Sequence, residues 1–536
     1  MNELIFYDIS SEQAMNLLPA QVQSLPLSPL YLAVKSGDLG TGLELIKKAS
    51  IEQRSALLDI DLWAKDEVSI ESFLFWVQAY SVLKTDNPVL ALEFCLSEQF
   101  QLFLKSKLNI YTFDIEDPQY PDHDNYFLTE DNLLLFEYDE AFTYVDEVKE
   151  MIFLLYSEMG VEKAYTYIFK TVAEDYSNYM EYSYLSKKKR LENLGYVDYY
   201  DTLKYETPLR NIGLVDSFIL GRNPEKLKLE PKNNAQEIKT PVILEHDILK
   251  QALRSITDKA RREYLDLSLI NALNNSLSFQ QSLSKGKVAT KNVSLRTMNR
   301  IRLGFEYASR KRKNVLELLD FRDLYLVGHS LVRIEQGKLK KYETAVYLSK
   351  NFIGDYWYSF YEASLVDSII RFSSLDNNSN EVNSYESYLN WSFYIKEFIS
   401  FCKFFEAFYG TLEKMKSSGD IANTYYANYN VEEIDFETLL LSCFANFANG
   451  SLDSQEDGKK LGITIEEYKI LLTKTLGDSK LSLINDFCEA FGLSGLKFSA
   501  DYVSYLLNFH LSGYSLDDIN DEQAKYLGGP LILNIH

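Results

Sequence analysis

The sequence contains few of the residues that form tight turns. Its 536 residues include only 23 glycines and 11 prolines, which is about 6% of the chain and roughly half the usual share. Sandwiches and barrels need a turn after every short strand, so this composition disfavours them and favours helices. Hydrophobic residues make up 46% of the chain and charged residues 25%, which excludes a disordered or fibrous protein. The length predicts about two to four domains.

Cysteines, targeting signals and long apolar runs are also scarce. The four cysteines lie far apart and form no C-x-x-C pair, which is typical of reduced thiols in apolar surroundings. The N-terminal residues do not include a basic region followed by an apolar stretch, so no secretory signal is expected. No stretch reaches the ~18 uncharged apolar residues that a membrane-spanning helix needs. We therefore expect a cytoplasmic protein that does not insert into a membrane.

The motifs of common cofactor and metal sites are absent as well. Neither a P-loop, G-x-x-x-x-G-K-[ST], nor a dinucleotide-binding G-x-G-x-x-G occurs. The five histidines form no pair at metal-ligand spacing. Segments 376–387 and 453–464 begin like calcium loops, but Ser387 and Thr464 stand where a bidentate glutamate is required. We expect no cofactor and no metal site.

One tripeptide, Gly328-His329-Ser330, resembles half of the nucleophile elbow of hydrolases. The strained elbow turn requires a second glycine after the serine, and Val332 stands in its place. Apolar residues from 324 to 334 recur at helical spacing, which favours a helix through this segment. We expect Ser330 to be unreactive, and we name no catalytic residue.

Short helical patterns separated by brief polar turns fill the chain from about Leu27 to Leu108. Ser50 is expected to cap one of these helices, with Gln53 at the capping-box position. Helices this short bury their apolar faces only by stacking on neighbours, as in superhelical repeats. Residues 1–109 are therefore predicted to form an α-superhelical, solenoid-like domain.

Residues 110–207 are predicted to form a small acidic α+β element. Tyr126–Leu128 and Leu133–Phe136 flank the polar residues Glu130–Asn132, which is typical of a β-hairpin. Thirteen Asp and Glu residues and a single Lys lie within 110–150. Helical spacing resumes after the hairpin, so the element combines a hairpin with helices.

The second half of the chain is predicted to be a helical domain that follows a linker. Four of the eleven prolines fall within 208–241, where periodicity is weak, so this segment is the predicted linker. Residues 242–536 then form the C-terminal helical domain. Its clearest helix spans about 384–416, where large apolar residues recur at alternating spacings of three and four. Such an aromatic stripe could stack bases or hold a ring cofactor, but we expect it to form core.

Several stretches resemble a bacterial family of unknown function. They are Leu27–Tyr31, Asp38–Leu39, Leu58–Trp63, Arg190–Tyr199 and Gly528–Leu533. The N-terminal third also resembles the helical superhelix that precedes the membrane part of some magnesium transporters. Because the chain contains no transmembrane part, that resemblance does not imply transport. Together the resemblances imply a helical fold and no particular activity.

Asp59 and Asp61 lie within one of these stretches, just before Trp63. Two neighbouring carboxylates near a helix end could bind a divalent cation weakly. Aspartate is more often a helix cap. We therefore expect the two residues to end one helix and cap the next, with Trp63 packed beneath them.

One segment is basic although the whole chain has a net charge of −23. We call residues 250–313 the basic island, because fifteen Lys and Arg lie there with four Asp and Glu. Its candidate interaction residues are Arg296, Arg300, Arg310, Lys311, Arg312 and Lys313. Three of the arginines fall on one helical face and are expected to face solvent or a partner. The acidic segment 110–150 could neutralise the island internally, since its charge is similar in size and opposite in sign.

The sequence predicts a mainly α protein that acts without catalysis in protein interactions or as a scaffold. Extended helical surfaces bind partners, and no catalytic set of residues is present. One alternative is a protein that binds RNA, DNA or another phosphate-rich ligand through the basic island. The sparse aromatic residues of the island and the acidic remainder of the chain disfavour nucleic acid. An enzyme without a recognisable motif is the third alternative.

Overall fold

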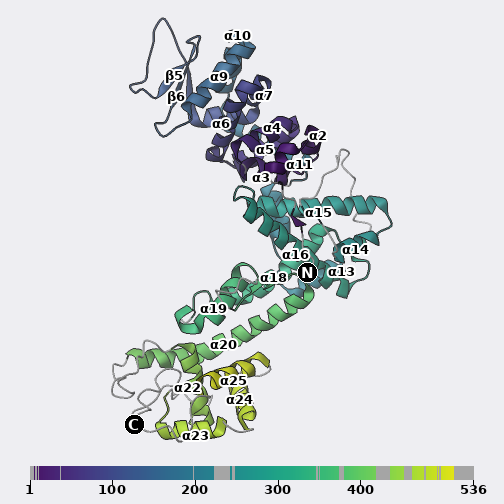
Figure 1. The fold of residues 1–536 in the computed structure, drawn as a ribbon, viewed down its shortest axis with the longest axis vertical. Helices are drawn as coiled ribbons and strands as arrows, with labels where there is room; N and C mark the ends of the chain where they lie inside the picture. Colours follow the sequence, from purple (N-terminus) through teal and green to yellow (C-terminus); the bar gives the residue numbers. More distant parts are fainter. Residues whose placement is uncertain are drawn as a thin grey trace. The chain divides into compact units, whose positions relative to one another are not determined.

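The computed structural model consists mainly of helices, as the composition predicts (Figure 1). It describes residues 5–6, 9, 11–36, 38–196, 198–222, 242–243, 248–345, 348, 350–372, 380–417, 435–451, 462–475, 479–491, 493 and 497–511. Of the two segments that begin like calcium loops, residues 376–379 and 453–461 lie outside the described residues, as does the stretch Gly528–Leu533.

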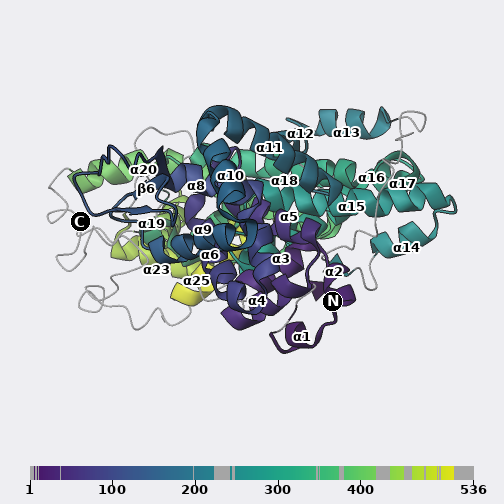
Figure 2. The same cartoon turned by 90° about the horizontal axis from the view of Figure 1, so that it is seen from above.

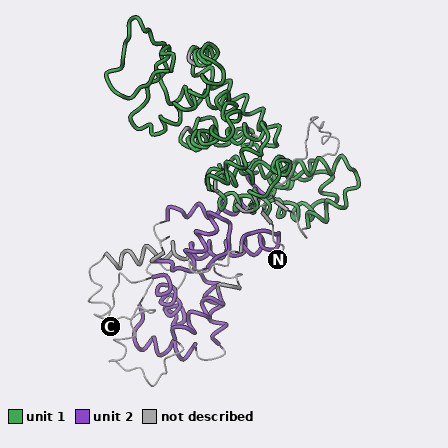
Figure 3. Tube along the Cα trace, turned by 45° about the horizontal axis from the view of Figure 1, so that its top comes forward, with its two compact units in different colours: residues 1–209, 213–329 green, residues 210–212, 330–536 purple. Residues whose placement is uncertain are grey.

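The chain divides into two compact units (Figure 3). Unit 1 comprises residues 1–209 and 213–329, and unit 2 comprises residues 210–212 and 330–536. This division does not test the domain limits expected at 109, 207 and 241, which stay predictions. Part of the expected linker forms helix α13 (Ile212–Leu220), and its residues 223–241 lie outside the described part of the chain.

Short helices that pack on their sequence neighbours form the N-terminal part of unit 1. They are α1 (Ser11–Asn16), α2 (Pro19–Gln23), α3 (Leu27–Ser36), α4 (Leu39–Lys48), α5 (Ile51–Leu62), α6 (Ile70–Asp86), α7 (Pro88–Cys95) and α8 (Glu98–Lys107). The expected capping box of α5 is confirmed. The Ser50 backbone N–H donates to Gln53 Oε1 over 3.1 Å, and the Gln53 backbone N–H donates to Ser50 Oγ over 3.2 Å.

The predicted hairpin is part of a three-stranded antiparallel sheet with the order β4-β6-β5. Its strands are β4 (Leu108–Thr112), β5 (Tyr126–Leu128) and β6 (Leu134–Tyr138). Phe127 pairs with Phe136 in register, and their rings stack with centroids 4.9 Å apart. The sequence analysis missed β4, which follows α8 without an intervening turn. Two short antiparallel pairs join β1 (Ile5–Phe6) to β7 (Val242–Ile243) and β2 (Trp63–Ala64) to β3 (Glu67–Val68).

Further helices complete unit 1, and several of them are longer than those of the N-terminal part. They are α9 (Val145–Met159), α10 (Val161–Ala173), α11 (Tyr176–Asn193), α12 (Tyr199–Glu206), α14 (Ile248–Arg254), α15 (Lys259–Phe279), α16 (Lys287–Lys311), α17 (Val315–Leu318) and α18 (Phe321–Leu339), whose last turns belong to unit 2. Helix α12 packs on α15, and α15 packs on α16. Helices α16 and α18 cross where Gly304 faces Gly328, so closely that a Cβ atom on Gly304 would overlap the Leu324 carbonyl oxygen. Glycine is therefore required at this crossing.

Unit 2 contains the predicted aromatic helix. Its elements are a 3₁₀ turn (Lys340–Tyr342), α19 (Lys350–Val366), β8 (Ile369–Ile370), β9 (Asn380–Glu381), α20 (Tyr385–Ser417), α22 (Phe436–Ala448), α23 (Ile465–Thr475), α24 (Ser479–Ala490) and α25 (Lys497–Leu511). On α20, Trp391, Phe398 and Phe401 are fully buried. The Trp357 ring of α19 lies 5.0 Å from the Phe401 ring. The aromatic stripe is therefore core as far as residue 403, and its side chains from 404 onward lie outside the described part.

Candidate functional site

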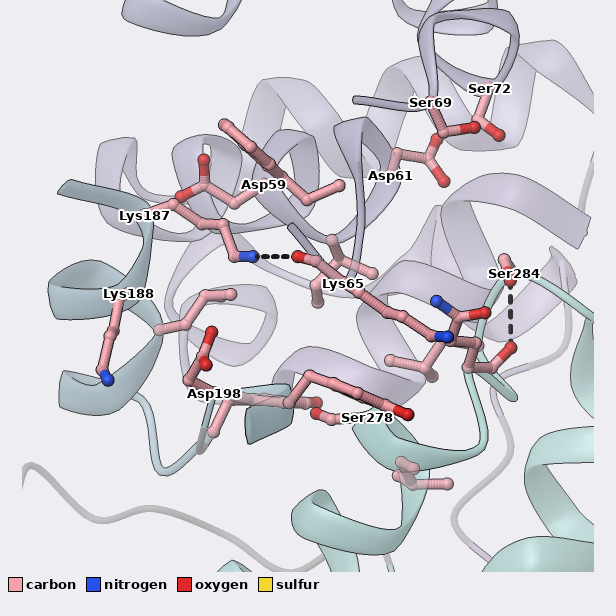
Figure 4. Close-up of a pocket in the computed structure, with 18 residues that line it drawn as sticks. Asp59, Asp61, Lys65, Ser69, Ser72, Lys187, Lys188, Asp198, Ser278 and Ser284 are labelled. Atoms are coloured by element: carbon pink, nitrogen blue, oxygen red, sulfur yellow. Dashed lines mark hydrogen bonds between the residues drawn. The ribbon is translucent and has the colours of Figure 1, made fainter. Parts of the chain in front are cut away.

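Unit 1 contains a pocket of about 190 Å³ where α5, β2, α11, α12 and the end of α15 meet (Figure 4). The residues that line it are Asp59, Ile60, Asp61, Trp63, Lys65, Ser69, Ser72, Lys187, Lys188, Leu191, Tyr196, Asp198, Tyr199, Leu277, Ser278, Gln281, Leu283 and Ser284. Two of the stretches that carried the family resemblance, around Asp59–Trp63 and Arg190–Tyr199, thus come together at one pocket.

Asp59 is held by residues from two other helices. It is 1% exposed, and Arg190 of α11 donates to its oxygens from Nε over 2.8 Å and from Nη2 over 2.9 Å. Gln99 Nε2 donates to Asp59 Oδ1 over 2.7 Å. Arg190 also contacts Glu98 through Nη1 at 2.8 Å. A buried carboxylate needs such partners, because burial without them is costly.

Asp61 is buried in a second polar cluster. It accepts hydrogen bonds from the Tyr31 hydroxyl, from Lys35 Nζ over 2.7 Å and from Trp76 Nε1 over 2.5 Å. Burial, followed by the Asp61 charge, raises the pKa of Tyr31 well above its usual value. These donors already occupy the carboxylate that was considered as a weak cation ligand.

The expectation that Asp59 and Asp61 cap the next helix is wrong. Both lie in the last turns of α5, and the chain then enters the β2–β3 turn before α6 begins. Trp63 is buried, as expected, and packs edge-on against Tyr184 with ring centroids 5.7 Å apart. Among the described residues, no group of three or more His, Cys, Asp or Glu is arranged to hold a metal ion.

Lys187 is the most unusual charged residue of the pocket. Its Nζ donates to the Lys65 carbonyl oxygen over 3.0 Å, as Figure 4 shows. The same nitrogen lies 5.0 Å from the centre of the Trp63 ring and 4.7 Å from that of Tyr184. Within the described part of the chain, no carboxylate lies within ion-pair distance of Lys187. Among the described residues, its close attractive partners are therefore one carbonyl oxygen and two aromatic faces.

The pKa of Lys187 is lowered by this environment. Lys187 is 7% exposed, and burial lowers its pKa from 10.5 to about 8, although the charges of Asp198, Asp59 and Asp66 act in the opposite direction. Desolvation thus outweighs the attraction of carboxylates that do not contact the amine. At neutral pH a measurable fraction of Lys187 is the uncharged amine.

The remaining charged residues of the pocket differ in whether they form an ion pair with a described residue. Lys188 pairs with Asp201 over 2.8 Å, which raises its pKa. Lys65 forms no ion pair with any described residue; its Nζ lies 5.0 Å from the centre of the Tyr199 ring. Asp198 accepts hydrogen bonds from the Tyr184 hydroxyl over 2.6 Å and from a backbone N–H, but no described cation contacts it. Among the described residues, the lining therefore has two lysines without an ion pair, of which Lys65 is exposed, and one such aspartate. The excess of one positive charge favours an anionic ligand.

Most of the arginine face expected on the basic island is inside the protein. Arg300 is 4% exposed, and Leu303 and Tyr307 on the same face are also buried. The expectation that this face meets solvent or a partner is wrong for these residues, because α16 packs between other helices of unit 1. Arg296 is partly buried, and Arg310 at the end of α16 is exposed.

The last residues of the island mostly bind α13. Lys311 Nζ pairs with Asp216 over 2.9 Å. Arg312 Nη1 donates to the carbonyl oxygens of Ile219, Leu220 and Arg222 over 3.2, 3.1 and 2.8 Å. An arginine thereby satisfies carbonyls that a helix end leaves open. Lys313 is exposed.

The acidic segment does not neutralise the basic island. Strands β5 and β6 lie at the opposite end of unit 1 from α15 and α16, as Figures 1 and 2 both show. The internal pairing considered from the charge balance is therefore excluded. Interaction through the exposed island residues stays a prediction.

Ser330 lies inside α18 and is fully buried, which confirms the helix expected through this segment. The glycine at position 328 is explained by the close crossing with α16, because a Cβ atom there would overlap the Arg300 carbonyl oxygen.

All four cysteines are free and buried. In the described part of the chain, no helix is long and apolar enough to cross a membrane.

The sequence analysis missed Lys187. It lies in the run Lys187–Arg190, and such a run usually indicates a solvated helix face. The available signal was its position next to the Arg190–Tyr199 stretch, combined with aromatic Tyr184 one turn before it.

Comparison with known proteins agrees with the resemblance. No curated protein and no solved structure gives a significant match to the chain. Residues 12–372 match the family of unknown function DUF6178. The match covers well over half of the 536 residues and contains both stretches that line the pocket, while Gly528–Leu533 lies beyond it. The chain therefore belongs to the family DUF6178.

Proposed function

We propose that the protein is a non-enzymatic binding protein whose ligand is a small organic or inorganic acid held in the Lys187 pocket. The observation that carries this proposal is the presence of two lysines, Lys65 and Lys187, that have no carboxylate partner among the described residues. A carboxylate or phosphate group would supply the missing negative charge. Charge-assisted hydrogen bonds to such groups are among the strongest in proteins.

The size of the pocket limits the ligand. Its volume of about 190 Å³ corresponds to roughly six water molecules at the ~30 Å³ that each occupies in the liquid. Drug-sized ligands occupy pockets of about 300–1,000 Å³. The ligand is therefore a small acid, and the pocket is too small for a nucleotide or a folded peptide.

The walls of the pocket add selectivity to this charge. Trp63, Tyr196 and Tyr199 provide apolar surface, while Ser69 and Ser278 add hydroxyl groups to the lining. A few polar groups set in an apolar wall are typical of specific ligand sites. This combination supports a compact organic acid more than a bare inorganic ion.

A protein-interaction or scaffold role is the second candidate. Exposed apolar side chains on α9 and α11 support it, namely Phe153, Tyr182 and Leu185. We place the protein in the cytoplasm and propose no transport role from the resemblance to magnesium transporters. Binding of RNA or DNA is the weaker alternative, because Lys311, Arg300 and Arg312 of the basic island are engaged or buried within unit 1.

Isothermal titration calorimetry tests the proposal with malonate and inorganic phosphate as probes, which separates carboxylate from phosphate recognition. Lys187→Gln should weaken binding of the preferred probe about tenfold or more, because a hydrogen bond to a charged group contributes about 1.5–3 kcal/mol. Lys189→Gln is the matched control, because Lys189 is exposed on the same helix and is not among the lining residues, and it should change binding by less than about twofold. Absence of binding of both probes, or equal binding by wild type and Lys187→Gln, would contradict the proposal.

A further inference from the structure

The Lys187 amine has unused bonding capacity inside the pocket. A lysine amine carries up to three N–H donors, and one described acceptor, the Lys65 carbonyl oxygen, binds it. The aromatic faces of Trp63 and Tyr184 cover part of the remaining surface. Because Lys187 also lines the cavity, a ligand in the pocket can reach the amine.

The amine is buried, and a carboxylate lines the same cavity without contacting it. Rings of Trp63 and Tyr184 favour the charged form of a lysine, yet burial dominates and lowers the pKa of Lys187 to about 8. Asp198 is the carboxylate that acts most strongly on Lys187. It also lines the pocket and is bound by the Tyr184 hydroxyl over 2.6 Å. A buried lysine without an ion-pair partner is the environment in which lysines act as nucleophiles.

We propose that Lys187 is a reactive lysine and that the ligand is a small oxo acid, whose aldehyde or ketone carbon forms a reversible imine with Lys187 Nζ. This inference rests on the proposed acid-binding function and names the chemical class of the ligand. The carbonyl of the oxo acid meets the Lys187 amine. The side chain of Lys65 extends away from that amine along the pocket (Figure 4), so Lys65 adds positive charge to the cavity without contacting the same carbon. The neighbouring Lys188 is excluded from this role by its ion pair with Asp201.

The reaction balances without any oxidant or reductant. The lone pair of the neutral amine attacks the carbonyl carbon, a C–N bond forms, and the C=O π electrons move to the oxygen. A proton passes from the nitrogen to that oxygen through water, because the oxygens of Asp198 accept from Tyr184 and from a backbone N–H and do not contact the amine. Loss of the hydroxyl group as water then leaves the C=N bond, and addition of water reverses every step.

Reductive trapping of the full-length chain tests the inference. The protein is incubated with glyoxylate and sodium cyanoborohydride, which supplies the hydride that converts an imine into a stable amine, and the modified peptides are mapped by mass spectrometry. We expect a carboxymethyl group on Lys187 that forms at least about ten times faster than on Lys188, because the neutral amine is far more abundant at Lys187. Excess glycolate, which resembles glyoxylate but has an alcohol in place of the aldehyde, should slow the trapping by competition.

Malonate binding by the wild-type chain separates the inference from the proposed function, because malonate has no aldehyde or ketone carbon and forms no imine. Lys187→Arg, which forms no stable imine, should show no carboxymethyl group at position 187. Malonate binding that depends on Lys187, without trapping of glyoxylate there, would overturn the imine and leave the acid-binding function standing. Equal modification of Lys187 and Lys188 would also overturn the imine. Absence of both malonate binding and trapping would overturn both proposals.

Discussion

Arg190 and Asp59 form a two-point ion pair between residues 131 positions apart in the sequence, with N–O distances of 2.8 and 2.9 Å. The pair joins α11 to α5, the two helices that contribute Lys187 and Asp61 to the pocket. Because Asp59 is buried and Gln99 also binds it, the position of one wall relative to the other depends on this contact.

Arg190→Ala should destabilise the protein by about 3 kcal/mol, because it leaves a buried carboxylate without its cation. Lys204→Ala is the control, since Lys204 forms an exposed pair with Asp201 and should cost less than about 0.5 kcal/mol. Urea denaturation measures both values. Equal effects of the two substitutions would show that the Arg190–Asp59 pair does not hold the pocket walls.

Gly304→Ala should destabilise the protein by about 1–3 kcal/mol or more, because the new methyl group must push α16 away from the Leu324 carbonyl of α18. Gly337→Ala is the control. Gly337 lies on α18, and nothing lies within 4 Å of a Cβ atom added to it. That substitution should stabilise by about 0.5–1 kcal/mol, from helix propensity alone. Thermal unfolding of the two variants gives opposite shifts if the helices cross as described.

Lys187→Met should stabilise the protein at pH 7 by about 1–3 kcal/mol, since it removes a buried charge without an ion-pair partner. The folded-state pKa of about 8 lies below the usual 10.5, so the folded chain releases this proton first as the pH rises. Wild-type stability should therefore increase relative to the variant between pH 8 and 10.5, and the difference should shrink there. Denaturation of wild type and variant at pH 7 and at about pH 9.5 measures the difference between their free energies of unfolding. A difference that does not change with pH would contradict the lowered pKa of Lys187.

The exposed residues of the basic island should not bind nucleic acid tightly. Fluorescence anisotropy with RNA and DNA oligomers at about 50 and 200 mM salt is the measurement, because phosphate contacts give a steep salt dependence. The variant Lys291→Glu/Arg310→Glu/Lys313→Glu changes only exposed side chains. Tight, salt-sensitive binding by the wild type that this variant loses would make nucleic acid the better candidate.

Features set by neighbouring residues could be predicted from the sequence. The capping box of Ser50 and Gln53, the hairpin around Phe127 and Phe136, and the aromatic core of α20 all follow from short-range spacing. The helix through Ser330 was predicted for the same reason. In each case the residues that decide the structure lie within a few turns of one another.

The candidate site could not be predicted in this way, because its contacts span the chain. Asp61 resembles a cap in the sequence, but its partners come from two other helices, Tyr31 and Lys35 from α3 and Trp76 from α6. Lys187 is the buried member of a basic run, and only the packing of α11 distinguishes it from Lys188. A helical wheel places Arg300 on a face expected to be exposed. In the structure α18 crosses α16 there, and Arg300 is buried.

The most direct test of the acid-binding pocket is nitrogen-15 NMR of the lysine side chains during a pH titration, with and without saturating malonate. We predict that the Lys187 amine titrates near pH 8 in the free protein and that malonate moves its pKa upward toward 10.5, since a bound carboxylate favours the charged amine. Titration of Lys187 near 10.5 in the free protein, or a pKa that malonate does not change, would contradict the account.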